Sequence, residues 1–192
     1  SRIGLQCVTL PQASHEAALS LINMGSPTAA KRDEEGLASF VRRLARYYDG
    51  NPEDFCGLEL DFGACTPFRQ EVLQAVRRIP HGEVKTYGQV ASEIGRKGSG
   101  RAVGRVMALN PLCIVVPCHR VLASDGSLGG FVGGLGMKAA LLTWEGVNLN
   151  SRNWLSQGSL EAALEDQRSD RVTLGVRMPV PGKLDRNAES PE

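Results

Sequence analysis

Residues 114–121, with the sequence IVVPCHRV, restrict the fold more than any other part of the chain. Three β-branched apolar residues predict a short buried strand, and Pro117, which cannot donate a backbone hydrogen bond, predicts that the strand ends there. Cys118 would then be held at the end of a rigid element, beside His119 and Arg120, whose charge favours the thiolate. Most free cysteines are structural, so this stretch alone fits a reactive and a structural Cys118 equally well.

Size and composition predict a globular intracellular protein, in the cytoplasm, or in the nucleus if the source is a eukaryote. The 192 residues suffice for one sizeable core, or for one domain with a small companion. No stretch approaches the ~20 apolar residues of a membrane span, and no secretory signal pattern is present. The five cysteines and three histidines lack disulfide-framework and metal-ligand spacings. We therefore expect no metal and no membrane association.

Basic residues are concentrated in the middle of the chain. Residues 1–66 carry 6 Lys/Arg against 9 Asp/Glu, residues 67–120 carry 9 against 3, and residues 121–192 carry 7 against 9. A basic segment inside a mildly acidic chain is typical of a polyanion-binding face. Taken alone, however, the charge fits a solvated basic helix surface better.

Patterns along the chain predict a small N-terminal α/β unit and a mainly helical part after it. The N-terminal unit comprises two helices and two strands, at residues 15–22, 33–48, 3–10 and 58–62. Thr66-Pro67 is a good helix start, and further helices are expected at 67–79, 86–94, 99–109 and 137–144. The pair 86–94 and 99–109, joined by a glycine-rich turn, has the pattern of a helix-turn-helix, although many helical hairpins bind nothing.

Two later segments stand apart from these helices. Residues 124–136 contain six glycines, which predicts a loop that approaches a ligand closely rather than a regular element. It lacks the lysine of a phosphate-binding loop, so nucleotide binding is not expected. Residues 151–192 are expected to form a partly disordered extension, with a helix-forming piece at 160–167 and a strand-like piece at 172–176.

Several motifs together resemble the O6-alkylguanine-DNA alkyltransferases over residues 58–148. They are the Thr66-Pro67-Phe68 helix start, Gly82-Glu83 before Tyr87, Arg101-Ala102-Val103-Gly104, Asn110-Pro111, Pro117-Cys118-His119-Arg120-Val121 and Glu145-Gly146. Related alkyltransferase-like proteins lack the cysteine that is present here. The resemblance implies an α/β (α+β) fold in three parts: an N-terminal α/β domain at 1–65, an alkyltransferase domain at 66–150 with a helix-turn-helix and a buried active-site cysteine, and the extension at 151–192.

The resemblance also implies an activity. Members of the family repair DNA by moving the alkyl group of O6-alkylguanine irreversibly onto a cysteine, once per molecule, and Cys118 is the matching residue. The expected partner is double-stranded DNA containing O6-alkylguanine, with O4-alkylthymine as a further candidate. The protein is expected to act as a monomer and without a cofactor.

Roles follow residue by residue from the same resemblance. Glu145 matches the residue that orients the histidine, and His119 the residue that deprotonates the cysteine through a water. A bridging water also suits residues 118 and 119 if they lie on an extended strand, where adjacent side chains point apart. Asn110 matches the residue that organises the site, and Tyr87 the residue that acts at the flipped nucleotide and protonates its ring nitrogen.

Two more residues are expected to contact the DNA. Arg101 matches the arginine that enters the base stack in place of the flipped nucleotide, from a helix-turn-helix in the minor groove. Ser124 begins the glycine-rich loop, which would form one wall of the base pocket. The sequence departs from the family at Phe131, where some members have tyrosine, and at Cys113, where proline is frequent. We interpret Cys113 as structural.

Two other functions stay open at this level. One is a binding module that recognises alkylated DNA and recruits partners, which the long extension would serve. The other is a cysteine–histidine hydrolase, which would need an oxyanion hole and would leave the basic segment unexplained.

Overall fold

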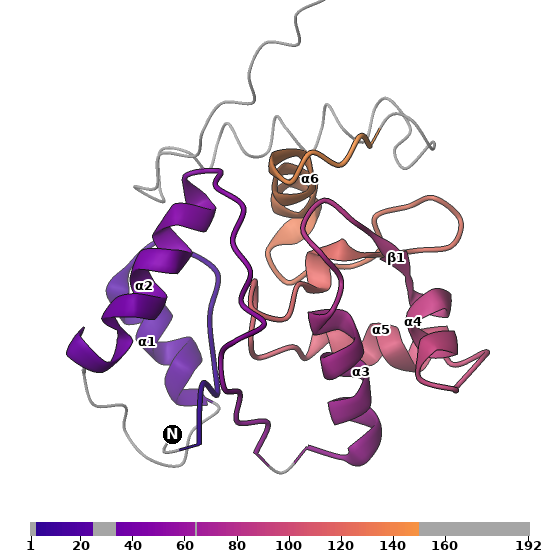
Figure 1. Ribbon diagram of the computed structural model, residues 1–192, viewed down its shortest axis with the longest axis horizontal. Helices are drawn as coiled ribbons and strands as arrows, with labels where there is room; N and C mark the ends of the chain where they lie inside the picture. Colours follow the sequence, from indigo (N-terminus) through magenta and orange to yellow (C-terminus); the bar gives the residue numbers. More distant parts are fainter. Residues whose placement is uncertain (1–2, 25–33, 64, 150–192) are drawn as a thin grey trace, which may run out of the picture.

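The computed structural model describes residues 3–24, 34–63 and 65–149, which form a mixed, helix-rich fold with a small parallel sheet (Figure 1). The predicted extension at 151–192 lies outside the described residues. The elements are, in order, α1 (His15–Met24), α2 (Glu34–Tyr48), α3 (Pro67–Arg77), β1 (Lys85–Thr86), α4 (Tyr87–Glu93), α5 (Gly100–Ala108), the 3-10 helix η1 (Cys118–Arg120), β2 (Val121–Leu122) and α6 (Gly134–Trp144).

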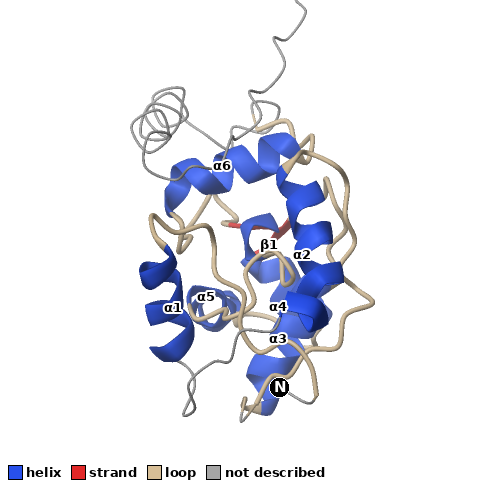
Figure 2. Ribbon diagram, turned by 90° about the vertical axis from the view of Figure 1, so that its left-hand side faces the viewer, coloured by secondary structure: helices blue, strands red, loops and turns tan. Residues whose placement is uncertain are grey.

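The sheet consists of two short parallel strands that the sequence patterns did not predict. Lys85 of β1 is in register with Val121 of β2, and Thr86 with Leu122. The strands lie between α6 and the group formed by α3, α4 and α5 (Figure 2). Since β1 runs directly into α4 and β2 directly follows η1, this pairing brings the start of α4 close to Cys118.

The helices predicted within residues 15–144 are confirmed, and two of them begin with side-chain caps. Thr66 Oγ1 accepts a hydrogen bond from the backbone N–H of Arg69 at 3.3 Å at the start of α3. At the start of α4, Thr86 Oγ1 accepts from the N–H of Gln89 at 3.1 Å, and the Gln89 side chain accepts from the N–H of Thr86 at 2.7 Å. Each such cap stabilises its helix by about 1 kcal/mol.

Helices α4 and α5 form a close pair. Gly95 and Gly98 in the connecting turn have φ angles of 71° and 88°, which are strained for any residue with a Cβ. At the start of α5, a Cβ added to Gly100 would lie only 3.4 Å from the backbone nitrogen of Gly88. The small residues therefore let the two helices approach with little side chain between them.

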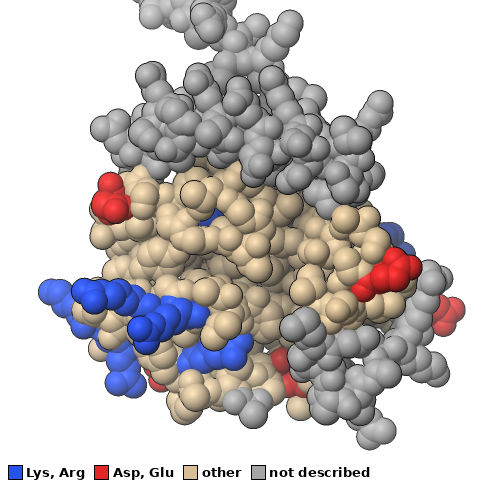
Figure 3. Space-filling model, turned by 180° about the vertical axis from the view of Figure 1, so that it is seen from behind, with Lys and Arg blue, Asp and Glu red and all other residues tan. Residues whose placement is uncertain are grey.

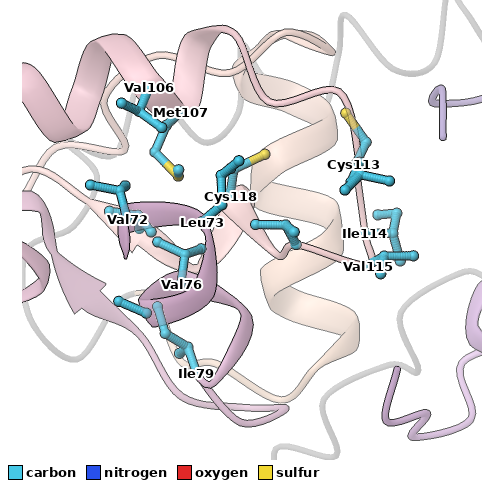
Figure 4. Packing of buried hydrophobic residues seen from close by; sticks show 14 of the residues in the cluster. Val72, Leu73, Val76, Ile79, Val106, Met107, Cys113, Ile114, Val115 and Cys118 are labelled. Carbon is cyan, nitrogen blue, oxygen red and sulfur yellow. The ribbon is translucent and has the colours of Figure 1, made fainter. Parts of the chain in front are cut away.

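The main hydrophobic core joins the helices to the segment that carries the cysteines. Val72, Leu73 and Val76 of α3 are fully buried in it. Residues 112–116 and Cys118 belong to the same cluster, in which Figure 4 shows Cys118. The buried thiol is therefore fixed by packing.

The two predicted N-terminal strands are wrong. Within residues 3–10 and 58–62, the pairing is reduced to isolated parallel bridges, Leu5 with Leu60 and Val8 with Leu112. The alternation seen in the sequence reflects packing against the core, in which Val8 and Leu10 are buried and Leu58, Leu60 and Phe62 are partly buried. The described N-terminal part is therefore two helices, α1 and α2, with extended segments joined only by isolated bridges, two from residues 3–10 and one from residues 58–62.

The predicted strand at 114–116 is also wrong, because this segment is a buried turn. The backbone N–H of Val116 donates to the carbonyl of Leu112 at 2.8 Å, and Ile114 has a φ of 71°. That conformation costs an L-residue about 1–2 kcal/mol, which the burial of the apolar run offsets. Cys118 then lies in the turn of a 3-10 helix, so the argument from an extended strand for a bridging water does not hold.

The glycine-rich segment 124–136 was predicted to be a loop throughout, but its last three residues are helical. Helix α6 begins at Gly134, so Gly134, Leu135 and Gly136 form its first turn instead of loop. A Cβ added to Gly133 would lie 2.6 Å from Leu10 Cδ1 and 2.8 Å from Met137 Sδ. A larger residue there would have to displace these two side chains, because the entry to α6 is packed against the N-terminal segment.

Candidate active site

A cavity of about 870 Å³ opens between α5 and the loop that follows β2, and Cys118 lies on its wall. It brings together four of the residues that the sequence singled out. Its lining includes Tyr87, Arg101, Gly104, Cys118, Ser124 and Phe131. Because Cys118 is only 4% exposed, a substrate atom has to enter this cavity to meet the sulfur.

Basic side chains border the cavity. Arg101 and Arg105 of α5 are exposed, as are Arg96 and Lys97 in the preceding turn, and residues 95–110 include no Asp or Glu. Figure 3 shows Lys and Arg gathered on the side of the molecule where α4 and α5 lie. The rim of the cavity can therefore attract a polyanion, while its interior stays mostly uncharged.

The surroundings of Cys118 favour its thiolate. The neighbouring Cys113 thiol, opposed by burial and supported by the Asn110 amide and the Lys138 ammonium, lowers the pKa of Cys118 to about 7. The interaction with Cys118 and burial raise the pKa of Cys113, which therefore stays protonated and donates to the carbonyl of Asn110 at 3.8 Å. Cys113, interpreted from the sequence as structural, thus also acts on Cys118.

Asn110 holds the turn that leads to Cys118 from inside. Its Nδ2 donates to the carbonyl of Val116 at 2.9 Å, and its Oδ1 accepts from the N–H of Leu112 at 3.0 Å. Both contacts are buried, so they fix the turn between the two cysteines.

Lys138, which the sequence reasoning missed, is the cation that acts on Cys118. It is fully buried, and its ammonium donates to the carbonyls of Val121 and Leu128 at 2.6 and 2.5 Å. Burial lowers the pKa of Lys138 to about 8, against the opposing influence of Cys118. The prediction that Arg120 would favour the Cys118 thiolate is wrong, because the guanidinium of Arg120 is paired with Glu145.

Arg120 forms a two-point ion pair with Glu145 just after α6. Its Nε and Nη2 donate to the two carboxylate oxygens at 2.7 and 2.8 Å, and its Nη1 donates to the carbonyl of Ile79 at 2.6 Å. Burial alone would raise the pKa of Glu145, but hydrogen bonds from His119 and Arg120 outweigh it and hold the pKa well below its usual range. Glu145 is therefore a buried anion.

His119 lies against this anion, as predicted for the pair. Its Nε2 is 3.0 Å from Glu145 Oε1, and its ring is fully buried. Burial lowers the pKa of His119, partly offset by Glu145, so the neutral imidazole is favoured. Because an ionised carboxylate only accepts, we infer that Nε2 carries the proton and Nδ1 the lone pair. Nδ1 has no hydrogen-bond partner among the described residues.

Tyr87 lies in the cavity between two glycines. A Cβ added to Gly104 would be 3.8 Å from the Tyr87 ring, and one added to Gly129 would be 2.9 Å from the Tyr87 hydroxyl. Burial raises the pKa of Tyr87, so the hydroxyl keeps its proton. The absence of a side chain at position 129 therefore sets where this hydroxyl lies.

Gly129→Ala is expected to displace the Tyr87 hydroxyl and slow the reaction of Cys118 with a substrate in the cavity. Gly129 has a φ of 65°, so the alanine also costs about 1 kcal/mol of stability. Gly130→Ala is the matched control, since a Cβ there meets nothing within 4 Å. Equal alkylation rates for the two variants, measured by intact mass, would contradict the role of this contact.

The predicted residues thus fall into two groups. Tyr87, Arg101, Ser124 and Cys118 line the cavity, whereas Asn110, His119 and Glu145 are buried. Phe131 lies between the cavity and His119. It lines the cavity and meets the His119 ring edge-on, at 6.4 Å between ring centroids. Sequence reasoning did not single out Lys138, because a lysine is rarely fully buried.

Among residues 3–24, 34–63 and 65–149, no group of three or more His, Cys, Asp or Glu is placed to hold a metal ion. None of the helices in these ranges combines the length and apolar character that crossing a membrane requires.

Comparison with known proteins identifies the family. The family model for the 6-O-methylguanine DNA methyltransferase DNA-binding domain matches residues 67–147. The methylated-DNA–protein-cysteine methyltransferase of Salmonella typhimurium is 49% identical over 104 residues, which cover 54% of this chain and 60% of that protein. The chain thus spans less than two thirds of this relative's length.

Two further relatives extend the match. The crystal structure of Mycobacterium tuberculosis OGT in complex with DNA is similar with a TM-score of 0.53 at 42% identity, covering 56% of this chain and 66% of that one. The methylated-DNA–protein-cysteine methyltransferase of Mycolicibacterium paratuberculosis is 40% identical over 120 residues, which are 62% of this chain and 72% of the relative. The chain therefore belongs to the methylated-DNA–protein-cysteine methyltransferase family.

Proposed function

We propose that this protein repairs O6-alkylguanine in double-stranded DNA by transferring the alkyl group to Cys118. The observation that carries the proposal is a thiol with a lowered pKa on the wall of a cavity with a basic rim. In the transfer, the sulfur attacks the alkyl carbon, the S–C bond forms and the O6–C bond breaks. The product is a thioether, which water does not cleave under mild conditions, so each molecule reacts once.

The buried pair behind the cavity supplies a path for the thiol proton. With Nε2–H directed to Glu145, the lone pair on His119 Nδ1 can accept the Cys118 proton through a water. Glu145 then stabilises the imidazolium, and Arg120 holds the carboxylate in place. This assigns His119 as the base and Glu145 as its positioning residue.

The DNA-facing roles belong to the cavity and its rim. An alkylated guanine inside a duplex cannot reach a buried sulfur, so the nucleotide has to leave the stack, at a cost of a few kcal/mol. We assign α4 and α5 as a helix-turn-helix, with Arg101 entering the stack in place of the base. Tyr87, which keeps its proton, would donate it to the ring nitrogen of the departing guanine, and Ser124 would contact the base.

The proposal is tested by stoichiometry. Duplex DNA with one O6-methylguanine is mixed with excess protein and then with limiting protein, and the methyl group is located by peptide mass spectrometry. One methyl per molecule, on Cys118, is the expected result. Turnover beyond one would refute the proposal, as would tight lesion binding with no alkylated Cys118, which would indicate a sensor.

Cys113→Ala is expected to raise the pKa of Cys118, because the thiol that lowers this pKa most is removed. A lowered thiol pKa means that the thiolate is present above about pH 7, so the variant should react more slowly at pH 7 and recover at higher pH. The measurement is the rate of alkylation by a benzylated guanine between pH 6 and 9. Cys56→Ala, at an exposed thiol, is the control and should leave the profile unchanged.

A further inference from the structure

We propose that Tyr47 is a positioning residue for alkyl transfer, which keeps the proton of His119 on Nε2 by bridging His119 and Glu145. The expected effect on the transfer rate rests on the proposed function, whereas the contacts of Tyr47 do not. Tyr47 is in α2, outside the 67–147 segment that matches the family model. If the inference holds, the N-terminal part of the chain supplies one component of the active site.

Three short distances form a closed triangle in the core. The Tyr47 hydroxyl donates to Glu145 Oε1 at 2.7 Å, His119 Nε2 lies 3.0 Å from the same oxygen, and the Tyr47 oxygen lies 3.3 Å from His119 Nε2. Tyr47 is 3% exposed, so water does not compete for these contacts. The hydroxyl donates to the carboxylate and turns a lone pair toward Nε2–H, a combination that fits only the Nε2–H tautomer.

The triangle also tunes how strongly His119 holds a second proton. The groups that act on His119 are Glu145, Arg120 and Lys138, of which only Glu145 favours the imidazolium. By donating to Glu145, Tyr47 withdraws part of the negative charge that would stabilise the imidazolium. Its 3.3 Å contact with Nε2 works in the opposite direction but is longer, so the 2.7 Å bond decides the sign. Tyr47 should therefore keep the imidazole neutral.

Packing around the ring allows the hydroxyl to be removed alone. The Tyr47 ring meets Phe55 and Tyr48 edge-on, at 6.1 and 5.7 Å between centroids, and a phenylalanine keeps both contacts. Tyr48 is the matched control, because its buried hydroxyl has no hydrogen-bond partner among the described residues. Tyr47→Phe and Tyr48→Phe therefore remove the same atom from neighbouring positions, but only the first opens the triangle.

The test has two measurements on the full chain. The imidazole titration of His119, one of three histidines, is followed by NMR in wild type, Tyr47→Phe and Tyr48→Phe. The transfer rate from an O6-methylguanine duplex is measured over the same pH range. We expect Tyr47→Phe to move the His119 titration to higher pH and to slow transfer about tenfold in the pH range where His119 titrates, with recovery at higher pH.

Each outcome separates the inference from the proposed function. No transfer by the wild-type protein would refute the function, whereas the NMR titration would still report on the triangle. An unchanged His119 titration in Tyr47→Phe would overturn the inference. So would a fall in rate that is equal at every pH, because a merely loosened core would produce that. Tyr48→Phe should match the wild type in both measurements.

Discussion

Cys118→Ala is expected to abolish alkyl transfer while leaving the affinity for lesion-containing DNA within a fewfold of wild type. The alanine removes the only atom that forms the new bond, and loss of a nucleophile costs about 10⁴-fold or more in rate. Tyr87, Arg101 and the basic rim are unaffected, so the contacts proposed for DNA remain. The measurements are methyl transfer in a single-turnover assay and binding by fluorescence anisotropy.

Cys118→Ser sharpens the same experiment. Serine keeps nearly the shape of cysteine, but its hydroxyl does not ionise near neutral pH, so it should be as inactive as alanine. Full activity in either variant would mean that another group accepts the alkyl chain. Cys113 would be the first to examine, since it is the thiol that most influences Cys118.

Glu145→Gln is expected to be the most destabilising single change in the site. Glutamine removes the charge that neutralises Arg120, and breaking one side of a buried ion pair costs about 3–5 kcal/mol. That is a large share of the 5–15 kcal/mol that typically stabilises a domain. Urea unfolding at pH 7 measures the change. Glu93→Gln, which removes a carboxylate from surface ion pairs with Arg78 and Lys85, should cost about 1 kcal/mol or less.

The stability lost in Glu145→Gln should also depend on pH, and it should be greater at neutral pH than at acid pH. The folded-state pKa of Glu145 lies well below its unfolded value of about 4.3, so its contribution to stability is complete above that pH. The contribution declines as pH falls below about 4, because the unfolded chain then binds a proton that the folded chain does not. The difference in unfolding free energy between wild type and Glu145→Gln should therefore be smaller at pH 3 than at pH 7. An equal difference at both would contradict the ionised state of Glu145.

Local chemistry made parts of this fold predictable and left other parts out of reach. The Thr66 cap and the amphipathic pattern after it predicted α3, because both signals come from residues that are close together in the sequence. The apolar run at 114–116 predicted a strand, but such a run reports burial rather than backbone conformation. The turn there depends on contacts with Val8 and Asn110, which are not adjacent in sequence.

The candidate site divides in the same way. Motif spacing pointed to Cys118, His119 and Glu145, and the structure places the latter two in contact. Tyr47 was not identified because its position on α2 fits an ordinary core-facing pattern, and Lys138 was not identified because a lysine is rarely fully buried. Their roles follow from where tertiary packing places a hydroxyl and an ammonium, and a single sequence has no local signal for that.

The bond between Tyr47 and Glu145 has a consequence for the order of folding. It joins residues 98 apart in the chain, and the Val8 bridge to Leu112 spans a similar separation. Contacts this distant form only after the entropy of closing a long loop has been overcome, so they are completed late. A newly made chain would then acquire its helices before the surroundings of Cys118 are complete, so the proposed alkyl-transfer site would form only in the last stage of folding.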